Sequence, residues 1–199
     1  MNQLQGTEKL KYVTWVLPTA KENRDAMSLA WYTPTKLRPR PAPRPELEDD
    51  EDEDGFLESS EYILKIIDDL ISHGIPIDRI VLAGFSQGCA MSLFIGLTSK
   101  FAGQFAGVVG LMGYLPLPGR LDDLRKQNAP ERDLSKQPAL ICRGSQDMLV
   151  PKRFHQICID KLASLRVPVE GREHSTGHSI SGSVIRDFLD FLTLNLGAL

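Results

Sequence analysis

The sequence predicts an α/β fold in which a mostly parallel sheet is covered by helices on both faces. Apolar, β-branched segments alternate with amphipathic ones along the chain. Residues 80–119 contain a single charged side chain, as is typical of strands buried on both faces. The 199 residues, 42% hydrophobic and 25% charged, fit one domain over residues 1–199 and exclude a collagen-like repeat, a disordered tail or a disulfide-stapled miniprotein.

The N-terminal half is expected to contain two strands and two helices. The short apolar stretch 12–17 indicates a strand. Apolar residues then recur at helical spacing, which predicts an amphipathic helix that begins near residues 59–60 and stops at Gly74. The β-branched segment 79–83 favours a strand, and the apolar segment 87–98 favours a helix.

The C-terminal half repeats the order of strand and helix. Strands are expected at 105–112, 139–143 and 167–172, and helices at 153–165 and 184–196. Strands that alternate with helices form a mostly parallel sheet with right-handed crossovers, and because the strands are parallel, their carboxyl ends should share one edge of the sheet.

A highly charged segment separates the first expected strand from the first helix. Prolines alternate with lysine and arginine over 33–45, and residues 46–54 then hold eight acids. Since proline removes backbone donors and like charges repel, residues 33–55 are predicted to form an extended, mobile surface loop. The alternative is a docking loop for a basic partner.

The chain shows no motif for a metal or a cofactor. Its three cysteines, Cys89, Cys142 and Cys158, lack metal-ligand spacing and are odd in number, which indicates a reducing compartment. The expected location is the cytoplasm, with the nucleus as a second location. No basic, aromatic-rich stripe suggests nucleic-acid binding. Glycines divide residues 80–119 into pieces too short to cross a bilayer.

The segment Gly84-Phe85-Ser86-Gln87-Gly88 fits the Gly-x-Ser-x-Gly pattern at the junction of an expected strand and an expected helix. Such a turn holds the serine in a strained conformation with its hydroxyl exposed, and glycines on both sides relieve crowding. Ser86 is therefore the candidate nucleophile. The backbone amide of Gln87, at the positive end of the helix, can donate to a developing oxyanion.

A serine nucleophile needs a base, and the base needs a carboxylate that orients it. Asp147 directly follows the strand expected at 139–143, so it should lie at the same sheet edge as Ser86. Asp160 lies in an amphipathic helix, and Asp122 and Asp123 lie in a polar segment, so these three are interpreted as solvated charges. Asp147 is the candidate acid.

Four histidines compete for the role of base. His178 lies on a small-residue loop between the last expected strand and the last helix, which makes it the candidate. His174 is its nearest rival, four residues earlier. His155 is expected to pack on its helix, and His73 to cap a helix end. Cys89 is expected to be a small buried residue rather than a nucleophile.

Four ordered motifs, between about Gly55 and Leu196, resemble the acyl-protein thioesterases, in the phospholipase/carboxylesterase branch of the α/β-hydrolases. They are Gly74 to Gly88, Gly113 to Leu117, Asp147 to Pro151 and Gly177-His178. The resemblance implies Ser86, Asp147 and His178 as a catalytic triad that hydrolyses fatty acyl thioesters on protein cysteines, and also lysophospholipids and carboxylic esters.

The same resemblance implies that Leu115, Leu117 and Met148 contact the acyl chain. Its implied partners are S-acylated proteins or lysophospholipids. These lie at membranes, so a transient contact with a membrane surface is expected, although the sequence shows no lipidation signal.

The resemblance is incomplete at the N-terminus. Family members begin with a strand and a His-Gly-x-Gly-Asp loop whose amide is a second oxyanion donor, and nothing in this sequence matches them. Residues 12–17 look like the following strand, so the fold is expected to be N-terminally truncated, with a gap between 12–17 and 79–83. One missing donor costs about 10² to 10³ in rate. The alternative function is therefore a catalytically impaired relative that binds lipidated protein, or a non-functional fragment.

Overall fold

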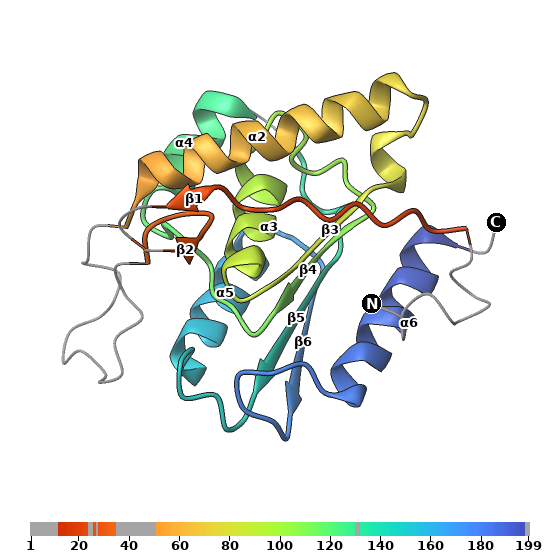
Figure 1. Ribbon diagram of the computed structural model, residues 1–199. Coiled ribbons are helices and arrows are strands. Elements are labelled where there is room, and N and C mark those ends of the chain that lie inside the picture. Colours follow the sequence, from red (N-terminus) through yellow and green to blue (C-terminus); the bar gives the residue numbers. More distant parts are fainter. Residues whose placement is uncertain (1–11, 24–25, 27, 35–50, 130–131, 198–199) are drawn as a thin grey trace.

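A four-stranded parallel sheet lies at the centre of the computed structural model, which describes residues 12–23, 26, 28–34, 51–129 and 132–197 (Figure 1). The strand order is β3-β4-β5-β6. The strands are β3 (Val81–Phe85), β4 (Gly107–Leu111), β5 (Ala139–Gly144) and β6 (Val169–His174). Because all four run in one direction, their carboxyl ends meet at one edge, which confirms the predicted α/β sheet.

Five helices and a small hairpin surround this sheet in the described part of the chain. The helices are α2 (Glu53–Ser72), α3 (Gln87–Thr98), α4 (Leu121–Asn128), α5 (Lys152–Ser164) and α6 (Gly182–Leu196), with a 3-10 turn at Ile77–Arg79. The antiparallel hairpin pairs β1 (Glu22–Asn23) with β2 (Ser28–Leu29).

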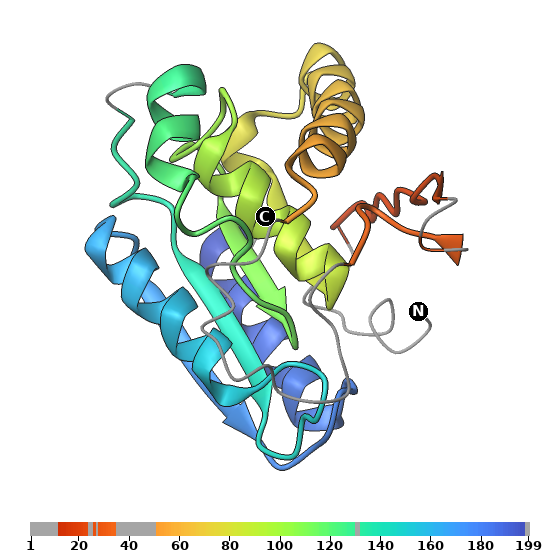
Figure 2. The same ribbon diagram turned by 90° about the vertical axis from the view of Figure 1, so that its left-hand side faces the viewer.

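Alternate residues of the central strands face two separate layers of helices. Val108 and Ile141 pack in one core with α3 and α5, whereas Val109 and Leu140 pack in another with α6. Figure 2 shows α5 in front of the sheet and α6 behind it, and α2 covers the outside of α3. The expected covering of both faces is confirmed.

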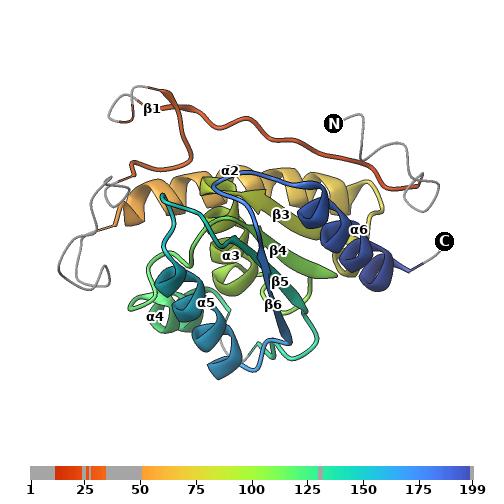
Figure 3. The ribbon, with the colours of Figure 1, turned by 90° about the horizontal axis from the view of Figure 1, so that it is seen from below.

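The strand expected at 12–17 is absent. Residues 13–20 have no regular structure and run from the hairpin toward α6 (Figure 3). Val13 and Trp15 pack with the α6 core, and the Trp15 ring lies 6.2 Å from that of Phe188. The apolar character of this stretch thus reflects packing on helix side chains rather than strand pairing. Among the described residues β3 is an edge strand, and none fills the suspected gap beside it.

Helix α2 begins earlier than expected, because part of the acidic run caps it. The Asp52 carboxylate is the N-cap and accepts bonds from Gly55 N at 3.0 Å and from Thr33 N at 2.7 Å. The predicted loop 33–55 is therefore wrong at its C-terminal end; residues 35–50 lie outside the described part of the chain. Burial acts to raise the Asp52 pKa, but the bonds from Thr33 and Gly55 hold it below its usual value.

Neighbouring acids also bond within the protein. The Glu51 carboxylate accepts a bond from Leu117 N at 2.6 Å, and Glu53 pairs with Arg120 at 3.0 Å. These residues tie the start of α2 to the segment before α4. For Glu51, Asp52 and Glu53, the interpretation of the acids as a solvated insertion is therefore wrong, whereas Asp54 is exposed.

Helix α4 was not expected from the sequence. It covers the polar segment that contains Asp122, whose carboxylate bonds Lys161 of α5 at 2.9 Å and is not merely solvated. At the end of α2, His73 Nδ1 bonds Asp69 O at 2.8 Å and Gly74 has a φ of +90°, as predicted. None of the described helices is both long and apolar enough to span a bilayer.

Candidate active site

Ser86 occupies a strained turn between β3 and α3. Its φ of 54° and ψ of −115° are unusual for a residue with a side chain, as predicted for a nucleophile elbow. A Cβ on Gly84 would lie 2.1 Å from the backbone of Gly88, so the turn cannot close with any other residue at 84. A Cβ on Gly88 would meet open space, so only the first glycine is required by crowding.

The structure brings Ser86, His178 and Asp147 into one hydrogen-bonded series. His178 Nε2 lies 3.0 Å from Ser86 Oγ, and His178 Nδ1 lies 2.8 Å from Asp147 Oδ2. Because a carboxylate only accepts hydrogen bonds, the proton of the neutral ring belongs on Nδ1 and leaves Nε2 free to accept from the serine. The predicted convergence of the three side chains is thus confirmed.

Asp147 is fixed by its own loop. Its Oδ1 accepts bonds from Leu149 N at 2.8 Å and Val150 N at 2.9 Å, which leaves Oδ2 for the histidine. Only 1% of its side chain is exposed, compared with 17% for His178. A buried carboxylate with three donors is well suited to orient an imidazole and to balance a positive charge on it.

The loop that carries His178 crosses directly over the end of β5. A Cβ on Gly144 would lie 2.4 Å from Gly177 O, so only glycine permits this crossing. The His178 ring also contacts the ring of Phe85, with their centres 4.9 Å apart. The sequence suggested neither contact, because each joins residues that are distant along the chain.

Gln87 contributes both its backbone and its side chain. As the first residue of α3 it has an amide without an intrahelical acceptor, directly after the nucleophile, which suits the predicted oxyanion role. Its Oε1 accepts from Trp31 N at 3.0 Å and its Nε2 donates to Tyr32 O at 3.3 Å. The side chain thereby ties the N-terminal segment to the elbow.

This N-terminal segment offers few free donors. Ala30 N bonds Lys21 O at 3.1 Å, Trp31 N bonds Gln87, and Thr33 N bonds Asp52. Within the described ranges the amide of Gln87 remains the predicted oxyanion donor.

The residues expected to contact the acyl chain differ in exposure. Leu115 and Leu117 are buried in the core, whereas Met148 is 86% exposed beside Asp147. Leu117 also has a positive φ of 47°. Of the three, Met148 is the residue that a substrate can reach without a rearrangement. Three further exposed apolar residues, which the sequence did not single out, lie next to members of the triad: Phe85, Leu149 and Ile180.

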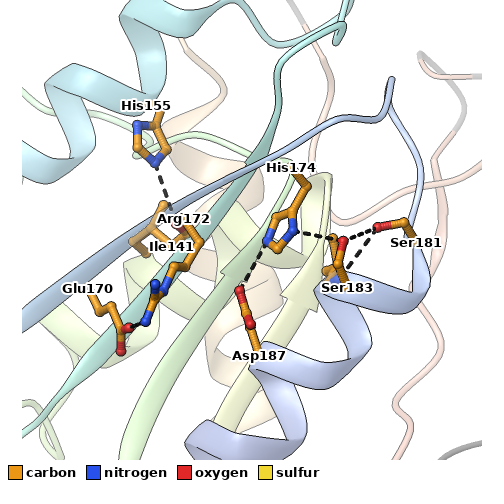
Figure 4. Close-up of polar contacts among 9 residues, drawn as sticks. Ile141, His155, Glu170, Arg172, His174, Ser181, Ser183 and Asp187 are labelled. Atoms are coloured by element: carbon orange, nitrogen blue, oxygen red, sulfur yellow. Dashed lines mark hydrogen bonds and ion pairs between the residues drawn. The ribbon is translucent and has the colours of Figure 1, made fainter.

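The competing residues are engaged elsewhere. Cys89 is fully buried, and burial raises the pKa of its thiol to about 12, which disfavours a thiolate. His155 packs on β5 with its Nε2 3.4 Å from Ile141 O, and burial lowers its pKa. His174 points at α6 (Figure 4) and is not the base. The described residues contain no cluster of three or more His, Cys, Asp or Glu side chains suited to hold a metal ion.

A parallel sheet that presents an elbow serine, a histidine and a buried aspartate at one edge defines a serine hydrolase site of the α/β-hydrolase type. The sequence agrees with this class, because the pattern of the phospholipase/carboxylesterase family matches residues 1–196. The chain belongs to this family.

Individual relatives match over different lengths. Acyl-protein thioesterase 1 of Schizosaccharomyces pombe is 31% identical over 83% of this chain and 72% of its own length. Acyl-protein thioesterase 1 of Emericella nidulans is 39% identical, but the match spans 50% of this chain and only 40% of that relative. The crystal structure of Arabidopsis thaliana SOBER1 shares the fold, with a TM-score of 0.81, 23% identity and coverage of 98% of this chain and 90% of that one.

Proposed function

We propose that this protein is a serine hydrolase that cleaves fatty acyl thioesters from cysteines of S-acylated proteins. The observation that carries the proposal is the hydrogen-bonded series Ser86–His178–Asp147. The names of the Schizosaccharomyces pombe and Emericella nidulans relatives support the thioester as the bond that is cleaved.

The geometry supports a two-step reaction. Ser86 Oγ attacks the thioester carbonyl while His178 Nε2 takes its proton, and the Gln87 amide stabilises the oxyanion. The cysteine thiolate then leaves with the proton from His178, and an acyl-serine remains. Water, deprotonated by His178, releases the fatty acid and restores Ser86. Asp147 stays ionised throughout and holds the ring in the reactive tautomer.

Exposed apolar side chains around the triad support a long acyl chain as the group that is transferred. Phe85, which contacts the His178 ring, is exposed, and so are Met148 and Leu149, which follow Asp147, and Ile180, two residues after His178. We infer that lysophospholipids and small carboxylic esters are accepted at the same site, and that contact with a membrane surface is transient.

We further propose that the protein works in a reducing compartment, the cytoplasm and the nucleus. In support, Cys89, Cys142 and Cys158 are free and buried. The alternative, an impaired relative that only binds lipidated protein, is less well supported, because the acid, the base and the nucleophile lie within hydrogen-bond distance of one another in series.

The test is to incubate the folded protein with a fluorophosphonate probe and map the labelled peptide, with Ser86→Ala as the control. We expect the label on Ser86 and hydrolysis of an S-palmitoyl peptide that Ser86→Ala lacks. Absence of the label from folded protein would refute the serine hydrolase. Labelling without turnover of any acyl thioester would favour the impaired relative.

A further inference from the structure

His174, the last residue of β6, anchors the two loops that carry the acid and the base. Its carbonyl oxygen accepts bonds from Ser145 N and from Thr176 N, both at 2.8 Å. Ser145 opens the loop that leads to Asp147, and Thr176 lies in the loop that leads to His178. The backbone of one residue thus fastens both loops at their origin.

The side chain of His174 fastens the far end of the second loop. Only 7% of it is exposed, and its ring points at α6 (Figure 4). Nδ1 lies 3.0 Å from Ser183 Oγ, within hydrogen-bond distance. Nε2 makes no hydrogen bond but lies 3.3 Å from Asp187 Oδ2, an ion-pair contact when the ring is protonated. Ser183 Oγ in turn lies 2.9 Å from the hydroxyl of Ser181, which caps α6 by accepting a bond from Val184 N.

These residue types repeat those of the triad, but the arrangement differs. The ring is reversed, with Nδ1 toward the serine and Nε2 toward the aspartate. The Ser183 hydroxyl is also held between the ring and the capping Ser181, so its bonds close the start of α6 onto the end of β6. The cluster therefore has the form of a structural tie rather than a second nucleophile.

We propose that His174 is a positioning residue for the hydrolysis proposed above, on which this inference rests. By joining the end of β6 to the first turns of α6, it fixes both ends of loop 175–181 and so holds His178 in line with Asp147 and Ser86. A displacement of about 1 Å in a reacting group is enough to cost about 100-fold in rate. Removal of the His174 ring contacts should therefore lower kcat more than it changes KM.

The first test compares His174→Phe with His155→Phe. Phenylalanine keeps a ring at 174 but removes both polar contacts. His155 is a matched control, because it is half-buried and packs from α5 on the opposite face of the sheet (Figure 4). We expect His174→Phe to lower kcat by about tenfold or more with little change in KM. His155→Phe should keep kcat, and His174→Gln, which retains a donor and an acceptor, should recover part of the loss.

A second readout does not depend on activity. The Nδ1 proton that His178 donates to Asp147 should give a low-field proton resonance in the wild type and in His155→Phe, and a shifted or lost one in His174→Phe. If the wild type hydrolyses nothing, the proposed function fails, yet this comparison still decides the positioning role.

A wild-type kcat together with an unchanged resonance in His174→Phe would overturn the inference. If His174→Phe does not fold, Asp187→Ala and Ser183→Ala decide instead, since each removes one contact of the ring from the α6 side. Unchanged kcat and resonance in both variants would equally overturn it.

Discussion

Gly144 and Gly177 lie so close that a Cβ on Gly144 would stand 2.4 Å from the Gly177 carbonyl oxygen. The loop that carries His178 thus contacts the end of β5 at Gly177, the residue before His178. Any side chain at 144 must push this loop away from Asp147.

Gly144→Ala should therefore lower kcat by about 100-fold while leaving most of the stability intact, because the loop can move but then misplaces His178. Steady-state hydrolysis of an activated ester measures the effect. Gly182→Ala is the matched control, since a Cβ there meets open space and kcat should not change. Equal activity of the two variants would show that the close approach does not position the base.

Gln87→Leu should destabilise the protein without abolishing labelling of Ser86. The substitution leaves the backbone amide in place but removes the partners of Trp31 N and Tyr32 O, and each unsatisfied group costs about 1 to 3 kcal/mol. Urea unfolding measures the loss. Gln104→Leu, which removes one exposed bond to Lys100 O, should change the free energy of unfolding by less than about 0.5 kcal/mol. Similar losses of unfolding free energy in the two variants would show that the bonds from Gln87 to the N-terminal segment do not stabilise the protein.

Asp52 should make the free energy of unfolding depend on pH in the acid range. Its pKa is lowered in the folded state, so its stabilising contribution is present above the unfolded value of about 3.9 and is lost as the pH falls through the lower folded value. When the pH is lowered from about 5 to about 3, the free energy of unfolding of Asp52→Asn should therefore fall by less than that of the wild type. The exposed Asp54→Asn serves as the control and should follow the wild type. Parallel curves for all three proteins would contradict the capping role.

The cysteines should resist thiol reagents until the protein unfolds. Burial raises the pKa of Cys89 and of Cys142 to about 12, and burial also raises that of Cys158. At neutral pH very little thiolate is present, and access is closed as well. We expect no reaction with a chromogenic disulfide in native buffer, three thiols per chain in denaturant, and no inhibition by the reagent. Rapid native labelling would show that one of these sites opens.

The convergence of the three candidates was predictable because each lies directly after a strand of a parallel sheet or in the loop that follows one. Alternation of strands and helices then suffices to place Ser86, Asp147 and His178 at one edge. The same local logic failed for residues 12–17, because a short apolar stretch fits packing on α6 as well as it fits a strand. Periodicity records which residues face inward, but not whether a strand or a helix covers them.

Contacts between distant segments could not be predicted from the sequence. The Gln87 side chain forms hydrogen bonds with the backbone of Trp31 and Tyr32, and the Glu51 carboxylate accepts one from the amide of Leu117. Nothing in the local pattern of either segment indicates its partner. The start of α2 was misplaced for a related reason, because an acidic run resembles a solvated loop unless one of its carboxylates is known to cap a helix.

The three catalytic candidates reach the site from two separate parts of the sheet. Asp147 and His178 follow the adjacent strands β5 and β6 and form a hydrogen-bonded pair, whereas Ser86 follows β3, the edge strand at the other end of the described sheet. The distance between Ser86 and this pair therefore depends on how β3 packs against the rest of the sheet. Substitutions that loosen or stabilise β3 would change kcat while the pair of His178 and Asp147 keeps its geometry.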